Sequence, residues 1–303
     1  MEGSTIQRVG IQATSKEITG SMTSAPCSGA LQFPRSAPRY DDRMTILRRC
    51  ALTLLAILLF AAHPLAAQTK QLQVACAADL QPVMPTLAAE YQRATGVHLV
   101  TAFGSSATLA QQLANGAPQD VFLSADTVHP QQLLDAGIAL GPVTPYARGV
   151  LVLWARNDSP LQPIAPKSIQ ATLKSPRLTR LAIANPTHAP YGLAAQQALQ
   201  HMGLYAQLQP RLAIAENIAQ TAQFAESGNA QAALISLTIA SSEHYRQLGR
   251  FVRIPSDAHA PIQQAGIVLK SSHQQQLARQ FLTWLTSPAI QQQLKSFGLD
   301  PAK

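Results

Sequence analysis

The chain has 303 residues, of which 47% are hydrophobic and only 13% are charged. This composition is ordinary for a globular protein and excludes the fibrous and broadly disordered classes. Residues 1–67 hold seven basic and four acidic side chains, and the rest of the chain, with 16 basic and 11 acidic side chains, carries a net charge of +5. Its Lys and Arg residues do not cluster as a nucleic-acid-binding face requires, and we therefore predict no nucleic-acid partner.

An export signal opens at Met44. The basic pair Arg48-Arg49 is followed by the apolar run 50–62 and then by small residues. This run is shorter than the roughly 20 residues that a membrane-spanning helix needs. The pattern predicts a signal peptide over residues 44–67, cleaved near Ala67. Twin-arginine export stays open beside general secretion.

Residues 1–43 precede a methionine that already begins a complete signal, and they show no apolar periodicity. We interpret them as a non-native extension from a mis-assigned start codon, or as a disordered segment. The mature protein is expected in a periplasm, starting near Gln68. Cys76 is then its single cysteine, which leaves no partner for an intramolecular disulfide.

Short β-rich runs alternate with longer segments of helical period from residue 68 onward, which indicates βαβ units and parallel sheets. We expect strands at 72–75, 98–103, 121–124, 149–154, 181–184, 212–215, 232–235 and 265–269. We expect helices at 80–94, 107–114, 130–136, 191–202, 218–227, 238–247, 273–286 and 288–296. The run 149–154 is apolar throughout, as in a strand that is buried on both faces.

The alternation restarts after residue 154, which predicts an α/β fold of two lobes, each a mostly parallel sheet flanked by helices. Lobe 1 is expected over residues 68–146 plus 255–303, and lobe 2 over residues 147–254. No linker rich in Gly or Pro separates them, so we expect crossing strands to join the lobes.

Small polar residues stand at four of the expected strand-to-helix junctions. They are Ala77-Ala78-Asp79, Gly104-Ser105-Ser106, the segment 185–192, and Glu216-Asn217-Ile218. Strand ends of this kind lie on one side of an open α/β sheet, where ligands bind, and helix amino termini offer unpaired N–H donors to an anion. Each junction alone is also what an ordinary helix cap looks like. Only the four together predict an anion site.

Three segments carry a resemblance to a known family: FGSSATLAQQLANGAPQDVFLSAD (103–126), YARGVLVLW (146–154) and NPTHAPYGLAA (185–195). They are similar to the periplasmic molybdate-binding proteins of ABC transporters, and the similarity spans nearly all of residues 71–299. The resemblance implies the type II periplasmic binding-protein fold, in which two lobes close on a tetrahedral oxyanion.

The resemblance also implies a ligand set and partners. The oxyanion-binding residues would be Ala78, Asp79, Ser105, Ser106, Tyr191 and Ile218, with Asn217 and Ser236 as weaker candidates. Tyr191 and Ile218 would bind through their backbone N–H groups. The ligand would be molybdate or tungstate, with no cofactor and with metal present only as the oxyanion. The partners would be an ABC permease and its ATPase, and the protein itself a monomer.

Asp79 departs from the family pattern, in which many members have Ser or Asn at this position. A carboxylate repels a dianion, at a cost of roughly 4 kcal/mol for two unit charges 4 Å apart at an effective dielectric near 20. Three interpretations stay open: Asp79 caps its own helix and offers only its backbone N–H, it is protonated and donates a hydrogen bond, or the ligand is not molybdate.

Other functions are less well supported by the residues. No Lys or Arg lies in the four junctions, so cavity size would favour molybdate and tungstate over sulfate. A carrier for sulfate, phosphate or an organic anion, or a sensing module of the same fold, stays an alternative. The chain has no G-x-S-x-G, H-E-x-x-H or Walker A motif, and a hydrolase that pairs His188 with Ser105 is a weak alternative. We therefore predict a binding protein and not an enzyme.

Overall fold

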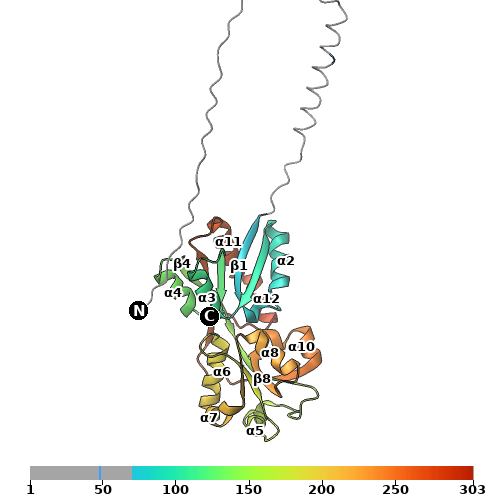
Figure 1. The fold of residues 1–303 in the computed structure, drawn as a ribbon. Helices are drawn as coiled ribbons and strands as arrows, with labels where there is room; N and C mark the ends of the chain where they lie inside the picture. The colour runs from blue at the N-terminus through green and yellow to red at the C-terminus, as the bar shows by residue number, and fades with distance from the viewer. Residues whose placement is uncertain (1–47, 49–69, 303) are drawn as a thin grey trace, which may run out of the picture. The chain divides into compact units, whose positions relative to one another are not determined.

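The computed structural model describes Arg48 and residues 70–302. Apart from Arg48, the predicted signal peptide and the segment 1–43 lie outside the described residues. Within these residues, no helix combines the length and apolar character needed to cross a bilayer. Residues 70–302 form two lobes, each built on one five-stranded sheet (Figure 1).

The sheet of lobe 1 has the strand order β2-β1-β3-β10-β4. Its strands are β1 (Gln71–Ala77), β2 (His98–Gly104), β3 (Val121–Ser124), β4 (Ala139–Gly149) and β10 (Ile262–Leu269). The strand β1 pairs in parallel with β2 and β3, whereas β10 pairs antiparallel with β3 and β4. The strand β10 therefore joins the parallel half of the sheet to β4.

The sheet of lobe 2 repeats this plan with the order β7-β6-β8-β5-β9. Its strands are β5 (Leu151–Arg156), β6 (Leu181–Ala184), β7 (Leu212–Ala215), β8 (Ala232–Ser236) and β9 (Gly249–Arg253). The strand β6 pairs in parallel with β7 and β8, while β5 pairs antiparallel with β8 and β9. Residues 151–155 of β5 are all buried, as their apolar sequence predicts.

Helices connect and cover the strands (Figure 1). In lobe 1 they are the 3-10 turn η1 (Ala78–Leu80), α2 (Met84–Thr95), α3 (Ser106–Ala114), α4 (Val128–Asp135), α11 (Gln275–Leu285) and α12 (Pro288–Ser296). In lobe 2 they are η2 (Pro166–Ser168), α5 (Ile169–Lys174), α6 (Pro190–His201), α7 (Tyr205–Leu208), η3 (Gln209–Arg211), α8 (Ile218–Glu226), α9 (Leu237–Ala240) and α10 (Glu243–Leu248).

The chain passes between the lobes twice. It crosses from β4 to β5 at Val150, and it returns over residues 254–261 from β9 to β10. The predicted two-lobed α/β fold is confirmed, with one correction to its detail. Each sheet is mixed and not mostly parallel, because the four strands on either side of the two crossings, β4, β5, β9 and β10, all pair antiparallel.

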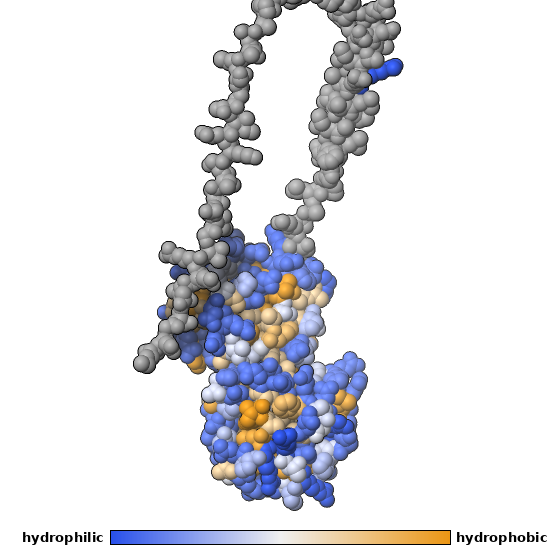
Figure 2. All heavy atoms as spheres, in the orientation of Figure 1, coloured by the Kyte–Doolittle hydropathy of each residue, from blue (hydrophilic) through white to orange (hydrophobic). Residues whose placement is uncertain are grey.

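Each lobe has its own hydrophobic core. The core of lobe 2 includes Trp154, and those of lobe 1 include Tyr91 and Phe122. The lobe 2 cluster also takes in Ala77, Ala78 and Ala125 of lobe 1, so apolar packing crosses between the lobes beside the strand ends. The surface is mostly hydrophilic on the visible face, with an apolar area on lobe 2 (Figure 2).

Helix α6 begins in close contact with the end of β6. A Cβ atom on Gly192 would lie 2.3 Å from the carbonyl oxygen of Ala184 and 2.8 Å from the carbonyl carbon of Asn185. Both of these are backbone atoms, which cannot move aside as the end of a flexible side chain can. Only glycine allows α6 to start this close to the strand.

We expect Gly192→Ala to destabilise the protein by about 1–3 kcal/mol, because the added methyl group overpacks a backbone contact. Urea unfolding of the ligand-free protein measures the change. A matched control is Gly141→Ala, whose Cβ would meet Leu134 at 3.4 Å, an ordinary contact. Equal stability of the two variants would contradict the close approach.

Candidate functional site

Four strand-to-helix junctions meet in one cavity between the lobes. The end of β1 and η1, and the end of β2 and α3, come from lobe 1, while the starts of α6 and α8 come from lobe 2. The cavity is small, with a volume of about 10 Å³. Its lining residues are Ala77, Ala78, Asp79, Gly104, Ser105, Ser106, Ala125, Ala189, Pro190, Tyr191, Asn217 and Ile218.

The structure brings most of the sequence-predicted site residues together here. Ala78, Asp79, Ser105, Ser106, Tyr191, Ile218 and the weaker candidate Asn217 all line the cavity. Ser236 is not among the lining residues. Its hydroxyl instead caps α9 by accepting the N–H of Ile239 at 3.4 Å.

Backbone N–H groups at three helix starts border the cavity. Ser105 caps α3 by accepting the N–H of Thr108, and Asn217 caps α8 by accepting the N–H of Gln220. First-turn N–H groups have no acceptor within their own helix. Those of Ser106, Tyr191 and Ile218 therefore remain as donors, each at the positive end of a helix dipole.

The Ser106 side chain adds a hydroxyl donor. Its Oγ accepts the N–H of Ala125 at 3.0 Å, and the side chain is buried. No acceptor for its hydroxyl proton is found among the described residues. A hydroxyl that already accepts one hydrogen bond still has its own proton to donate. The cavity thus contains neutral donors of two kinds, and none of its lining residues is Lys or Arg.

Asp79 accepts hydrogen bonds from both lobes. Its Oδ2 accepts from the Tyr191 hydroxyl of α6 at 3.1 Å and from the Gln264 amide of β10 at 2.5 Å. The hydroxyl of Thr238, in α9, donates to the Asp79 carbonyl oxygen at 2.7 Å. Its Oδ1 is buried without a hydrogen-bond partner in the described part of the chain.

The expectation that Asp79 caps its own helix is wrong. The N-cap position of η1 is Ala77, and no side chain caps this turn. The carboxyl group accepts instead from Tyr191 and Gln264, and these donors satisfy one oxygen of a fully buried side chain. Burial raises the pKa of Asp79 to about 6, and the hydrogen bonds from Gln264 and Tyr191 oppose this rise.

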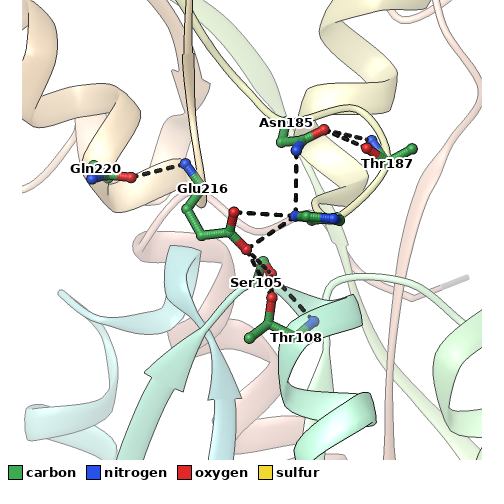
Figure 3. A network of polar contacts seen from close by, with 7 residues as sticks. Ser105, Thr108, Asn185, Thr187, Glu216 and Gln220 are labelled. Atoms are coloured by element: carbon green, nitrogen blue, oxygen red, sulfur yellow. Dashed lines mark hydrogen bonds and ion pairs between the residues drawn. The ribbon is translucent and has the colours of Figure 1, made fainter. Parts of the chain in front are cut away.

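A second polar network joins the lobes at the edge of the cavity (Figure 3). Glu216 Oε1 accepts from Thr108 Oγ1 at 2.8 Å and, more weakly, from Ser105 Oγ at 3.4 Å. The Nδ1 atom of His188 lies 3.1 Å from each carboxylate oxygen of Glu216. The hydrogen bond from Thr108 contributes most to lowering the pKa of Glu216, with help from His188 and Ser105.

Sequence reasoning missed the residues that bridge the lobes. Gln264 lies just ahead of the apolar run 265–269, where the expected strand began, although β10 starts at Ile262. Glu216 stood in a recognised junction, but only tertiary packing reveals its contact with Thr108. The only feature of the sequence that could have indicated Glu216 was its position next to Asn217, the cap of α8.

Two mixed sheets whose strand ends and helix starts enclose an interlobe cavity define a type II periplasmic binding protein. The chain belongs to the family described as bacterial extracellular solute-binding protein, whose model matches residues 72–300. A location outside the cytoplasm, periplasmic or extracellular, agrees with this family.

Relatives within this family confirm the predicted resemblance. The molybdate-binding protein ModA of Azotobacter vinelandii is 33% identical over 77% of this chain and 91% of its own. ModA of Rhodobacter capsulatus is 32% identical over 82% of this chain and 95% of its own. The solved periplasmic molybdate-binding protein of A. vinelandii has a TM-score of 0.69 and 31% identity, covering 75% of this chain and 98% of that one.

The buried carboxyl of Asp79 should make stability depend on pH. Folding raises its pKa from 3.8 to about 6, so the folded state binds more protons than the unfolded state between these values. The free energy of unfolding therefore falls as pH rises through this window, by up to about 3 kcal/mol, and levels off above it. Urea unfolding of ligand-free protein at a series of pH values measures the fall. Asp79→Asn should remove it, and an equal fall in that variant would contradict this assignment.

Proposed function

We propose that this protein captures molybdate, and tungstate as well, in the periplasm and delivers it to an ABC importer. The observation that carries this proposal is the convergence of neutral donors from both lobes on one cavity. The N–H groups of Ser106, Tyr191 and Ile218 and the Ser106 hydroxyl would bind the oxyanion, together with the backbone of Ala78 and Asp79. The molybdate-binding relatives support the choice of ligand.

Selectivity would come from the size of the cavity. Neutral donors fixed by helix starts bind any tetrahedral dianion, so discrimination depends on whether every donor reaches an oxygen. A smaller anion leaves buried donors unpaired, which costs binding free energy. Molybdate and tungstate have longer bonds than sulfate and would therefore bind more tightly.

Asp79 would be protonated, or partly so, when a dianion is bound. Its pKa of about 6 in the ligand-free protein is already close to neutral pH. A dianion nearby raises the pKa of a carboxyl further. Protonation removes the charge repulsion between Asp79 and the ligand. Of the three interpretations of Asp79 made from the sequence, the protonated one is best supported.

The contacts around Ser105 support a binding protein and not a hydrolase. Glu216 contacts both the Ser105 hydroxyl and His188. A nucleophilic serine needs the histidine next to it, with the acid behind the histidine. Here the carboxylate lies next to the serine, and no hydrogen bond between His188 and the Ser105 hydroxyl is found among the described residues. The solute-binding relatives agree with this proposal.

The remaining parts of the proposal follow from the family. The protein would act as a monomer, without a cofactor, on a permease and ATPase at the inner membrane. The signal peptide 44–67 would export it. Adjacent genes for a permease and an ATPase would support transport over ligand sensing.

Calorimetry of the refolded and dialysed mature protein (68–303) tests the ligand. We expect molybdate and tungstate to bind at least about a hundredfold more tightly than sulfate and phosphate, because the smaller anions leave donors unpaired in a dry cavity. Sulfate binding as tight as that of molybdate would contradict the size argument. Failure of all four anions to bind would refute the proposed function.

Ser106→Ala tests the donor set. Loss of a hydrogen bond to a charged ligand should weaken molybdate binding by about 10- to 100-fold. Ser236→Ala is the matched control, since this serine is equally buried but lies outside the cavity lining. It should leave the affinity within about threefold of the wild type. Equal losses in the two variants would argue against a direct contact of Ser106 with the ligand.

A further inference from the structure

Three side chains from both lobes meet at the rim of the cavity. Thr108 lies in the first turn of α3 in lobe 1, whereas His188 and Glu216 precede α6 and α8 in lobe 2. Glu216 accepts the Thr108 hydroxyl at 2.8 Å and contacts His188 at 3.1 Å (Figure 3). The N–H of Ala107 also donates to the carbonyl oxygen of His188 at 3.1 Å. We call Thr108, His188 and Glu216 the interlobe clasp.

One member of the clasp, Glu216, lines a polar groove that adjoins the cavity. This groove, of about 470 Å³, is lined by Ala78, Gln81, Phe103, Glu216, Asn217, Ala219, Gln220 and Gln223. Ala78 and Asn217 line both the groove and the cavity, so the two spaces adjoin. Glu216 lines the groove, and its carboxylate accepts from Ser105, which lines the cavity. The side chain of Glu216 is 48% exposed, as expected of a residue that faces the groove.

We propose that the interlobe clasp holds the two lobes closed and controls the exchange of the bound anion between the cavity and the groove. The identity of that anion rests on the function proposed above. Glu216 is a positioning residue in this account, because it ties lobe 2 to the start of α3 and does not itself bind the anion.

Separation of the lobes must break the clasp. The Thr108–Glu216 and Ala107–His188 hydrogen bonds each join one lobe to the other. The first is accepted by a carboxylate, and such charge-assisted bonds are stronger than neutral ones. Because both exist only when the lobes are closed, they favour the closed state and slow the release of whatever the cavity holds.

A matched control exists within lobe 2. Glu226 accepts from the Tyr245 hydroxyl at 2.7 Å and contacts His244 Nε2 at 2.7 Å. This cluster has the same chemistry as the clasp, a carboxylate with one hydroxyl and one imidazole. Its members come from α8 and α10 of the same lobe, so lobe separation leaves it intact.

Stopped-flow measurement of molybdate release tests the proposal. We expect Thr108→Val and Glu216→Gln each to release molybdate about 5- to 20-fold faster than the wild type, and the double variant to be no faster than the faster single one, since both remove the same contact. Glu226→Gln should stay within about twofold. Unchanged release in the two clasp variants, or equal acceleration in Glu226→Gln, would overturn the proposal.

Amide hydrogen exchange of the ligand-free protein separates this proposal from the proposed function. The Ala107 N–H, which donates across the lobes, should exchange at least about fivefold faster in Glu216→Gln than in Glu226→Gln. This readout needs no ligand. Wild-type protein that binds none of the anions would refute molybdate capture alone, whereas equal exchange at Ala107 in the two variants would refute the clasp.

Discussion

This site depends on the backbone N–H groups at helix starts, which lack hydrogen-bond partners in their own helices. Each lobe places two strand-to-helix junctions at the same edge of its sheet, because its parallel strands run in one direction. The N–H groups of Ser106, Tyr191 and Ile218 have no acceptor in their own helices. Closure of the lobes removes much of the water that would otherwise bind these groups, so an anion becomes their best partner.

Asp79 adds a second constraint to the site, which is the contact between the two lobes. It brings a carboxyl into a cavity of neutral donors, but it also joins the lobes, because it accepts hydrogen bonds from Tyr191 and Thr238 of lobe 2. Tyr191 contributes both to the cavity and to the contact between the lobes, since its backbone N–H borders the cavity and its hydroxyl donates to Asp79. The proposed anion site and the contact between the lobes are therefore linked through the same residue.

The sequence predicted the elements whose signal is local and missed those that depend on tertiary contacts. The parallel strands follow from periodicity, and they were predicted. Helix caps were considered at each junction because Ser and Asn are typical cap residues, and Ser105 and Asn217 are caps in the structure. Strand β4 was missed because Gly141, Pro142 and Pro145 are typical of turns, yet pairing with β10 holds it extended. The side-chain direction of Asp79 was also missed, since its partners lie 112 and 185 residues away in the chain.

Because the chain crosses between the lobes twice, the two lobes become complete at different times during synthesis. Lobe 2 is one continuous segment between Val150 and β10, so all of its strands are available once that segment has emerged. Lobe 1 is completed only by β10, which lies inside its sheet between β3 and β4. Contacts this distant in sequence form slowly. The amino-terminal half of lobe 1 therefore cannot complete its sheet until β10 has been synthesised.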